Sequence, residues 1–266
     1  MFSDAFNLDE LNHALAGSRF AGRLHYFPSI PSTNTHAMQQ ADAGAPDGSV
    51  YCADEQTLGR GRGAHSWSSP PGSGLYVSIL LRPRIAPADI LWLSLAAGLA
   101  VQKAIHDVTS LRADLRWPND LLFGRKKFCG ILTEINAEFT RVRHAVIGIG
   151  INVHQPEFPA ELRDIATSLT VETGRNWPRQ ELLLALLQSL DCEVRALADS
   201  AGAEQYARSM RDRLTASSSW IRGKRVRVEE GDGFTGTTDG LDPRGFLLVR
   251  TADGLRTVYS GGVREG

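Results

Sequence analysis

The chain has 266 residues, of which 42% are hydrophobic and 22% are charged, and its formal net charge is −1. This composition is typical of one large globular domain or two unequal ones, and the near-neutral charge argues against a nucleic-acid-binding protein. Three widely separated cysteines without a CxxC pair indicate reduced thiols in a cytoplasmic protein. The N-terminus lacks signal-peptide character, and the longest apolar run, about 12 residues from Ile90 to Val101, is too short to span a membrane.

The first 55 or so residues predict short helices that alternate with strands. Residues 7–16 predict a helix, and Leu24–Phe27 predicts a strand that is ended by Pro28 and Pro31. Ser32-Thr33-Asn34 has N-cap chemistry for a helix that runs to about Ala43. A further strand, Val50–Ala53, follows.

An unusual run, Gly59-Arg60-Gly61-Arg62-Gly63, then leads to Trp67. Glycine permits sharp turns and close approach of a ligand to the backbone, and arginine supplies a forked positive charge suited to phosphate and carboxylate. The glycine spacing fits neither a dinucleotide fingerprint nor a P-loop. Taken alone, the run fits an anion-binding loop and a flexible basic surface loop equally well.

The middle of the chain predicts a buried strand, Leu75–Leu81, and a central helix from Ile90 to Ile105 that Asp89 caps. Leu115–Trp117 predicts a short strand that Pro118 ends, which leaves Asn119 and Asp120 at its mouth. This Asn-Asp pair can bind a ligand or help to hold Mg²⁺, and simple turn chemistry is the alternative.

Two further strands carry residues that suggest chemistry. Before the strand Ile131–Ile135, Lys127 and Gly130 place an ammonium at the entrance of a strand that glycine opens, although a hairpin turn there is an alternative. The strand Ala145–Val153 contains Gly148 and Gly150, which indicate close approach of a ligand or of a packed helix. Asn152 in the same strand needs hydrogen-bond partners if it is buried.

The last third predicts an amphipathic helix over Gln180–Leu197, a weaker helix over 203–214 and a polar linker over Thr215–Ser219. Short strands and glycine-containing turns then predict a small β-barrel that packs against the larger domain, because so small a unit rarely stabilises itself. We therefore expect two domains, residues 1–216 and 220–266. The predicted barrel strands are Lys224–Val228, Phe234–Thr238, Gly245–Val249 and Arg256–Tyr259.

The order and spacing of these motifs are far more specific than any one of them. Over about residues 24–262 the chain closely resembles the biotin–protein ligases, also called biotin–acetyl-CoA-carboxylase ligases. The motifs that carry the resemblance are Ser32-Thr33-Asn34, the Gly-Arg-Gly-Arg loop with Trp67, Trp117-Pro118-Asn119-Asp120, Lys127-Phe128-Cys129-Gly130-Ile131-Leu132, Gly148-Ile149-Gly150-Ile151-Asn152-Val153 and Ala166-Thr167-Ser168-Leu169.

The resemblance implies an α+β fold, in which a mixed, bent sheet with helices on one face is followed by an SH3-like β-barrel. It implies that the biotin carboxylate attacks the α-phosphate of ATP, with Mg²⁺, to give biotinyl-5′-AMP and pyrophosphate. A lysine of the biotin carboxyl carrier protein then takes the biotin and releases AMP. The first family motif begins near residue 24, which predicts the enzyme-only type without an N-terminal DNA-binding domain. Both a monomer and a homodimer are compatible with the sequence.

The resemblance also implies roles for individual residues. Lys127 should bridge the biotin carboxylate and the α-phosphate, with Arg60 and Arg62 as the other catalytic cations, and Asp120 should help to hold Mg²⁺. The nucleotide should contact Trp67, Asn119, Lys127 and Asn152. Biotin should contact Ser32, Thr33, Asn34, Gln56, Gly59, Arg60, Arg62, Lys127, Gly130, Leu132, Gly148 and Gly150.

Two alternatives remain open. A lipoate–protein ligase shares this fold and adenylate chemistry, although the Gly-Arg-Gly-Arg loop and the C-terminal barrel favour biotin. A regulator that binds nucleic acid through the Gly/Arg loop is disfavoured by the neutral charge. The chain departs from the family pattern at Gly63, Ala64 and His65, which makes the loop less basic and puts nucleotide affinity in question.

Overall fold

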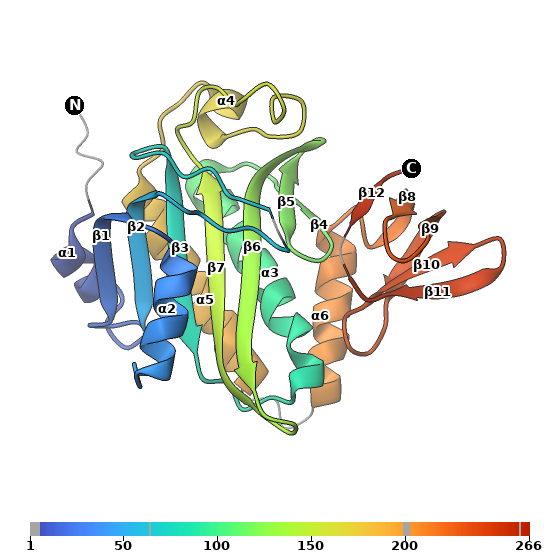
Figure 1. Cartoon of the computed structure of the whole chain (residues 1–266), viewed down its shortest axis with the longest axis horizontal. Coiled ribbons are helices and arrows are strands. Elements are labelled where there is room, and N and C mark those ends of the chain that lie inside the picture. The colour runs from blue at the N-terminus through green and yellow to red at the C-terminus, as the bar shows by residue number, and fades with distance from the viewer. Residues whose placement is uncertain (1–5, 64, 199–202, 261) are drawn as a thin grey trace.

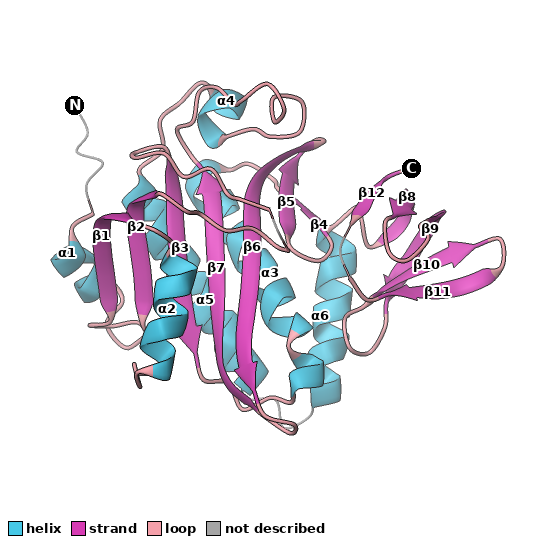
Figure 2. Cartoon of the chain, in the orientation of Figure 1, coloured by secondary structure: helices cyan, strands magenta, loops and turns pink. Residues whose placement is uncertain are grey.

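The computed structural model describes residues 6–63, 65–198, 203–260 and 262–266. A large N-terminal domain is built on a seven-stranded sheet, and a small five-stranded domain follows it (Figures 1 and 2). The strands of the large domain are β1 Leu24–Ile30, β2 Val50–Gln56, β3 Gly74–Leu81, β4 Asp114–Arg116, β5 Asp120–Phe123, β6 Lys126–Ala137 and β7 Val142–Asn152. The helices are α1 Leu8–Ala14, α2 Thr33–Asp42, the 3-10 turn η1 Pro87–Asp89, α3 Leu91–Thr109, α4 Leu169–Thr173, α5 Arg179–Ala198 and α6 Ala203–Ser217.

The large sheet is mixed, as predicted. Its strand order is β1-β2-β3-β7-β6-β5-β4, in which β1 and β2 run parallel and all other neighbours run antiparallel. Of the two prolines predicted to end the first strand, Pro28 lies within β1, which continues to Ile30 and stops directly before Pro31. Because β1 lies at the edge of the sheet and pairs with β2 alone, a residue without an N–H is tolerated there.

One face of the sheet packs on α3 and α5, which lie behind it in Figure 1. The inward side chains of the central strands, such as Val77, Ile79 and Ile149, are almost fully buried with leucines from both helices. Within the described residues, α3 is the one helix long and apolar enough to cross a membrane. Its apolar surface is instead buried in this core, which confirms the prediction of a central helix.

The opposite face is only partly covered. Helix α2 packs there, with Ala37 and Ala41 against Tyr51, Leu80 and Val146 (Figure 1). It begins where predicted, since Ser32 is the N-cap residue and its hydroxyl accepts from the Thr35 N–H. The part of this face beyond the N-terminus of α2 lies under the loop that joins β2 to β3 and forms the cleft described below.

The prediction that Asp89 caps the central helix is also wrong. Asp89 belongs to η1, which Pro87 begins, and α3 starts at Leu91 with Ile90 as its N-cap residue and no side-chain cap. Proline suits the first position of such a turn because its fixed φ is already helical, so the entry to the helix is displaced from the acidic residue.

The small domain is an antiparallel sheet with the order β11-β10-β9-β8-β12. A fifth strand, β12, was not predicted because three residues carry no readable alternation. The polar stretch predicted as a linker begins within α6, which extends to Ser217. The strands are β8 Arg222–Val228, β9 Phe234–Leu241, β10 Leu247–Thr251, β11 Gly254–Val258 and β12 Val263–Glu265.

A second hydrophobic cluster joins the two domains, as expected for so small a unit. Trp92 and Leu95 from α3 and Trp117 after β4 are buried together with Leu247 and Val249 of β10. The Trp117 indole N–H donates to the Gly245 carbonyl over 2.9 Å. The small domain is therefore fixed against the large one through buried apolar area and a buried hydrogen bond.

Candidate functional site

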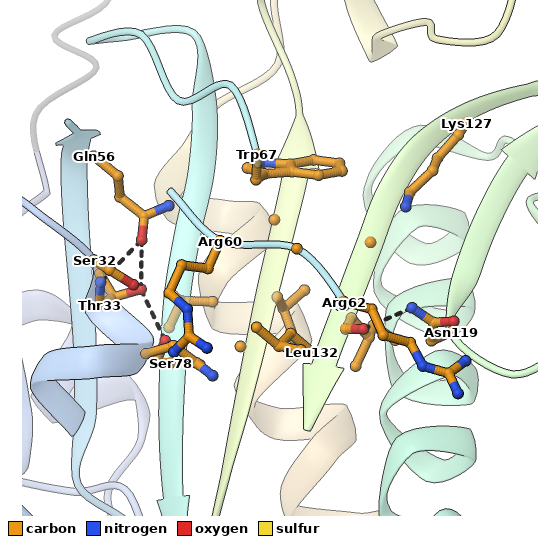
Figure 3. A pocket seen from close by; sticks show the side chains of 18 residues that line it. Ser32, Thr33, Gln56, Arg60, Arg62, Trp67, Ser78, Asn119, Lys127 and Leu132 are labelled. Atoms are coloured by element: carbon orange, nitrogen blue, oxygen red, sulfur yellow. Dashed lines mark hydrogen bonds between the residues drawn. The ribbon is translucent and has the colours of Figure 1, made fainter. Parts of the chain in front are cut away.

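An open cleft of about 450 Å³ lies on the partly covered face of the sheet, beneath the loop that joins β2 to β3. Figure 3 shows Ser32, Thr33 and Gln56 on one side of this cleft and Lys127, Asn119 and Arg62 on the other. Leu132 lies between the two sides and Trp67 above. Most of the residues that sequence reasoning selected are thus brought together from α2, β6, β7 and the loop.

The first side of the cleft is a network of neutral polar groups. The Gln56 Oε1 accepts from the Thr33 N–H over 2.9 Å and from the Thr33 hydroxyl over 3.0 Å, and its Nε2 donates to the Ser69 hydroxyl. The buried Ser78 hydroxyl lies 2.8 Å from Thr33 Oγ1 and 2.9 Å from Asn34 Oδ1. These groups can turn both donors and acceptors toward an uncharged polar ligand.

The floor of the cleft is formed by glycines that face each other across two strands. Gly130 pairs with Gly150 and Leu132 pairs with Gly148 in the β6–β7 register. The Trp67 ring lies on this glycine pair, since a Cβ on Gly150 would lie 2.5 Å from Trp67 Nε1 and a Cβ on Gly130 would lie 3.0 Å from Trp67 Cζ3. The close approach predicted at Gly130 and Gly150 is therefore that of Trp67.

Trp67 is held from both sides but keeps one unused donor. The backbone N–H of Trp67 donates to the Gly59 carbonyl over 2.9 Å, and this bond closes the base of the loop. Lys127 Nζ lies 5.2 Å from the centroid of its ring, a cation–π contact. The indole Nε1 is buried without a partner in the described structure, so it is a donor that a ligand can use.

The second side of the cleft is cationic and is built around Asp120. Lys127 Nζ lies 2.5 Å from Asp120 Oδ1, and Arg116 Nη2 lies 2.7 Å from Oδ2. Burial acts to raise the pKa of Asp120, but the Lys127 ammonium and the Arg116 guanidinium outweigh it and hold the pKa below its usual value. Asp120 is therefore an anion that fixes two cations in place.

The ion pairs of Asp120 bear on its predicted Mg²⁺ role. Both carboxylate oxygens already contact cations. No group of three or more His, Cys, Asp or Glu side chains in the described part of the chain is placed to hold a metal ion. At nucleotide sites, however, Mg²⁺ is commonly held by one or two carboxylates together with substrate phosphates and water. Asp120 thus holds Lys127 in this structure, and a role of Asp120 toward Mg²⁺ stays a prediction.

The two loop arginines differ in their surroundings. Arg60 makes an ion pair with Glu134, whereas the exposed Arg62 side chain makes no ion pair or hydrogen bond with the described residues. Arg62 also lines a second, larger cleft between the two domains, together with Asn119, Arg244, Phe246 and Tyr259. Of the loop residues that make the chain less basic than its family, Gly63 and His65 are exposed and Ala64 lies outside the described residues.

The two predicted nucleotide-binding asparagines lie in different places. Asn119 lines the cleft, and its Nδ2 donates to the Ile131 carbonyl over 2.9 Å. The buried Asn152 is not among the described residues that line either cleft, and its Nδ2 donates to the Thr167 carbonyl over 3.0 Å. That bond fastens the segment Ala166–Leu169 beside β7, so a role of Asn152 toward a nucleotide stays a prediction.

Sequence reasoning missed three polar residues of the site: Glu134, Ser78 and Ser69. Ser78 was visible as the one polar residue in an otherwise apolar strand. Glu134 gave a weaker signal, because a charged residue two positions beyond Leu132 on a strand also fits an exposed face. Strand alternation puts it on the same side of β6 as Gly130 and Leu132, but only the tertiary structure shows that Asn34 and Arg60 meet it there.

Comparison with known proteins agrees with this geometry. Residues 26–152 match the biotin/lipoate A/B protein ligase family, and residues 222–263 match the biotin protein ligase C-terminal domain. The chain is 35% identical to the bifunctional ligase/repressor BirA of Bacillus subtilis, over 97% of this chain and 78% of that protein. It is 34% identical to the biotin–acetyl-CoA-carboxylase ligase of Mycobacterium tuberculosis, over 96% and 92% of the two chains.

Solved structures extend the agreement to three dimensions. The biotin protein ligase from Aquifex aeolicus in complex with biotin and ATP superimposes with a TM-score of 0.77 and 31% identity, over 91% of this chain and 98% of that one. Both domains of the chain are therefore included in the match.

Proposed function

Because the chain belongs to the biotin protein ligase family, we propose that its cleft joins biotin to ATP and passes the biotin to a lysine of the biotin carboxyl carrier protein of acetyl-CoA carboxylase. One observation carries the proposal: the cleft is neutral and hydrogen-bonding at one end and cationic at the other (Figure 3). Biotin has the matching form, with an uncharged ureido head, an apolar chain and a terminal carboxylate.

The polar end suits the head group. Thr33, Ser78 and Gln56 form a buried network whose hydroxyl and amide groups present donors and acceptors in fixed directions. Leu132 and the Trp67 ring, which covers the glycine pair, offer an apolar path to the opposite end. A buried network of this kind discriminates strongly, because a ligand that fails to satisfy it leaves polar groups unpaired.

The cationic end suits the reaction. A carboxylate oxygen of biotin attacks the α-phosphorus of ATP, the bond from that phosphorus to the bridging oxygen breaks, and pyrophosphate leaves. Lys127 and Arg62 line this end of the cleft. Their positive charges reduce the repulsion between the biotin carboxylate and the ATP phosphates and stabilise the charge that develops on the phosphoryl oxygens. No side-chain nucleophile is needed, since the carboxylate is the nucleophile.

In the second step, an uncharged lysine amine of the carrier attacks the carbonyl carbon of the mixed anhydride. An amide forms, the bond to the phosphate oxygen breaks, and AMP leaves with its electron pair. The cleft between the domains opens beside Arg62 and Asn119 and offers a route for that lysine. We place the protein in the cytoplasm with its carrier, and Mg²⁺ enters with the ATP phosphates.

A direct assay tests the proposal. The full chain is incubated with biotin, Mg-ATP and a biotin carboxyl carrier domain, and the mass of the carrier domain and the release of pyrophosphate are measured. We expect one biotin on one lysine and one pyrophosphate for each biotin. A carrier of unchanged mass, with no pyrophosphate released, would show the proposal to be wrong.

The same assay addresses the alternatives. Lipoate replaces biotin, and a lipoyl carrier domain replaces the biotin carrier. Activation of lipoate without activation of biotin would assign the chain to the lipoate branch of the family, although the match of residues 222–263 to the biotin protein ligase C-terminal domain favours biotin.

A further inference from the structure

The Gly/Arg loop carries two arginines whose charges are used differently. The Arg60 guanidinium meets Glu134 as a fork, with Nη1 at 3.0 Å from Oε2 and Nη2 at 3.0 Å from Oε1. A two-pronged pair of this kind fixes both the position and the orientation of the arginine. Arg62, two residues later, has no such partner in the described structure. One loop charge is therefore neutralised and the other is free.

Glu134 is itself held in place by buried groups. Asn34, almost fully buried at the start of α2, donates from Nδ2 to Glu134 Oε2 over 2.7 Å. The Asn34 Oδ1 in turn lies 2.9 Å from the Ser78 hydroxyl of β3. Gly148 on β7 leaves the space for this amide, because a Cβ at that position would clash with Asn34 Oδ1. The carboxylate is thus a rigid acceptor rather than a mobile surface group.

The place of this pair in the cleft gives it a function. Gly130, Leu132 and Glu134 alternate along one face of β6, so Glu134 stands beside the floor of the cleft. Arg60 lies on the arm of the loop that crosses this floor, and Arg62 lies farther along the loop toward Asn119 (Figure 3). When the Arg60 arm is held on the sheet, Arg62 is kept at the cationic end.

We propose that Glu134, anchored by Asn34, is a positioning residue that latches Arg60 and so holds the loop over the cleft, while Arg62 alone of the two arginines meets the anionic ligands. This inference rests on the proposed ligase function for its catalytic consequences, but the latch itself exists without ligand. It revises the expectation that Arg60 and Arg62 act alike on biotin and its adenylate.

The charges give the proposal a distinctive consequence. Without Arg60, Glu134 becomes an uncompensated anion beside a site for carboxylate and phosphate, and it repels them. Arg60→Gln should therefore be more harmful than the double variant Arg60→Gln with Glu134→Gln, in which both charges are absent. If Arg60 instead bound the phosphate directly, Glu134→Gln would free it for the ligand and the double variant would recover nothing.

The latch is tested first without any ligand. Trypsin is added to the wild type and to Glu134→Gln, Glu134→Asp and Arg60→Lys, and cleavage after Arg62 is followed by mass. We expect cleavage about fivefold faster in Glu134→Gln and in Glu134→Asp, whose shorter side chain cannot reach the fork, and an intermediate rate in Arg60→Lys. Glu138→Gln is the matched control, because that exposed carboxylate pairs with Arg141 and Arg143 away from the cleft. Equal cleavage rates in all five proteins would overturn the latch.

The second experiment compares Arg60→Gln, Glu134→Gln and the double variant with the wild type. It measures the KM for biotin, the kcat for pyrophosphate release, and the labelling of a bystander protein by escaped adenylate. We expect a higher biotin KM and more escape in Glu134→Gln, and partial recovery in the double variant relative to Arg60→Gln. Loss in Arg60→Gln together with wild-type behaviour of Glu134→Gln would assign Arg60 directly to the ligand. Wild-type protein that ligates no biotin would refute the proposed function, while the trypsin arm would still decide the latch.

Discussion

At the scale of single residues, the cleft is organised by charges that are already paired before any ligand binds. Lys127 contacts Asp120 and the face of Trp67, and Arg60 contacts Glu134. Such contacts limit the freedom of long side chains, so less entropy is lost when a substrate arrives. We propose that Lys127 is the cation that turns from its protein partner toward a phosphate.

Lys127→Ala tests this role. We expect pyrophosphate release with biotin and ATP to fall about 100-fold or more, because a fixed cation is lost where charge develops. Lys126→Ala is the matched control, since the half-buried Lys126 donates to the Arg163 carbonyl and is not among the residues that line the cleft. Equal activity in Lys127→Ala and the wild type would remove Lys127 from the reaction.

Arg62→Gly tests the free loop charge. We expect biotinyl-AMP to escape and to label lysines of bystander proteins, because the loop loses its unpaired cation over the anionic intermediate. Arg125→Gly, in the turn between β5 and β6, serves as the control. Labelling by Arg62→Gly that stays confined to the carrier domain would show that Arg62 does not retain the adenylate.

The low pKa of Asp120 predicts how stability depends on pH. Because the folded pKa lies below the unfolded value of about 3.9, ionised Asp120 stabilises the fold above that pH, and the contribution is lost as the pH falls through the folded pKa. From about pH 5 to pH 3, the wild type should lose more unfolding free energy than Asp120→Asn. Urea titrations at each pH measure this, and Asp253→Asn, in an exposed turn, should follow the wild type.

At the scale of elements, a buried cation joins the start of α5 to the sheet. Arg179 is 3% exposed and donates from Nη1 to Asp54 over 2.7 Å and to the Gly74 carbonyl over 3.1 Å. Its guanidinium also lies over the Phe6 ring. Asp54 belongs to β2 and Gly74 to β3, the two strands that flank the Gly/Arg loop. Arg179 therefore ties together the two strand ends between which the loop lies.

Arg179→Met should lower the free energy of unfolding by about 3 kcal/mol, because removal of one partner leaves a largely buried carboxylate and a carbonyl without their donor. Lys103→Met on the exposed face of α3 breaks the i,i+4 pair with Asp107 and should cost less than about 0.5 kcal/mol. Chemical denaturation measures both variants. Similar losses in the two would contradict a special role for the buried cation.

At the scale of the whole molecule, the small domain completes the core of the large one. Tryptophans and leucines from α3 and the segment after β4 lie in one buried cluster with residues of β10 and its neighbours. The cleft between the domains borders the active-site cleft through Arg62 and Asn119. The small domain therefore supports the segment that carries Asn119 and Asp120.

Trp117→Phe tests this attachment. It removes the bond from the indole N–H to the Gly245 carbonyl and should lower the free energy of unfolding by about 1 kcal/mol. Trp67→Phe is a matched comparison, because its indole N–H has no partner among the described residues and its removal costs no hydrogen bond. A larger loss from Trp67→Phe than from Trp117→Phe would show that the hydrogen bond at Gly245 does not fasten the domains.

The sequence alone determined the family, the two-domain order, the central helix and most residues of the cleft. These depend on local chemistry: the N-cap at Ser32, the apolar run of α3, and glycines and cations at characteristic spacings. Local patterns were weaker at element ends, since the edge position of β1 tolerates Pro28 and the turn at Pro87 displaces the entry to α3.

Only the tertiary structure decided which groups are partners. Asn34, Arg60 and Glu134 lie far apart in sequence and meet because α2, the loop and β6 converge on one face of the sheet. Likewise, only the structure shows that Asp120 is the partner of Lys127 and Arg116. A motif fixes which side chains are present, but charge pairing depends on distances across strands, and the register and packing of the whole sheet set those distances.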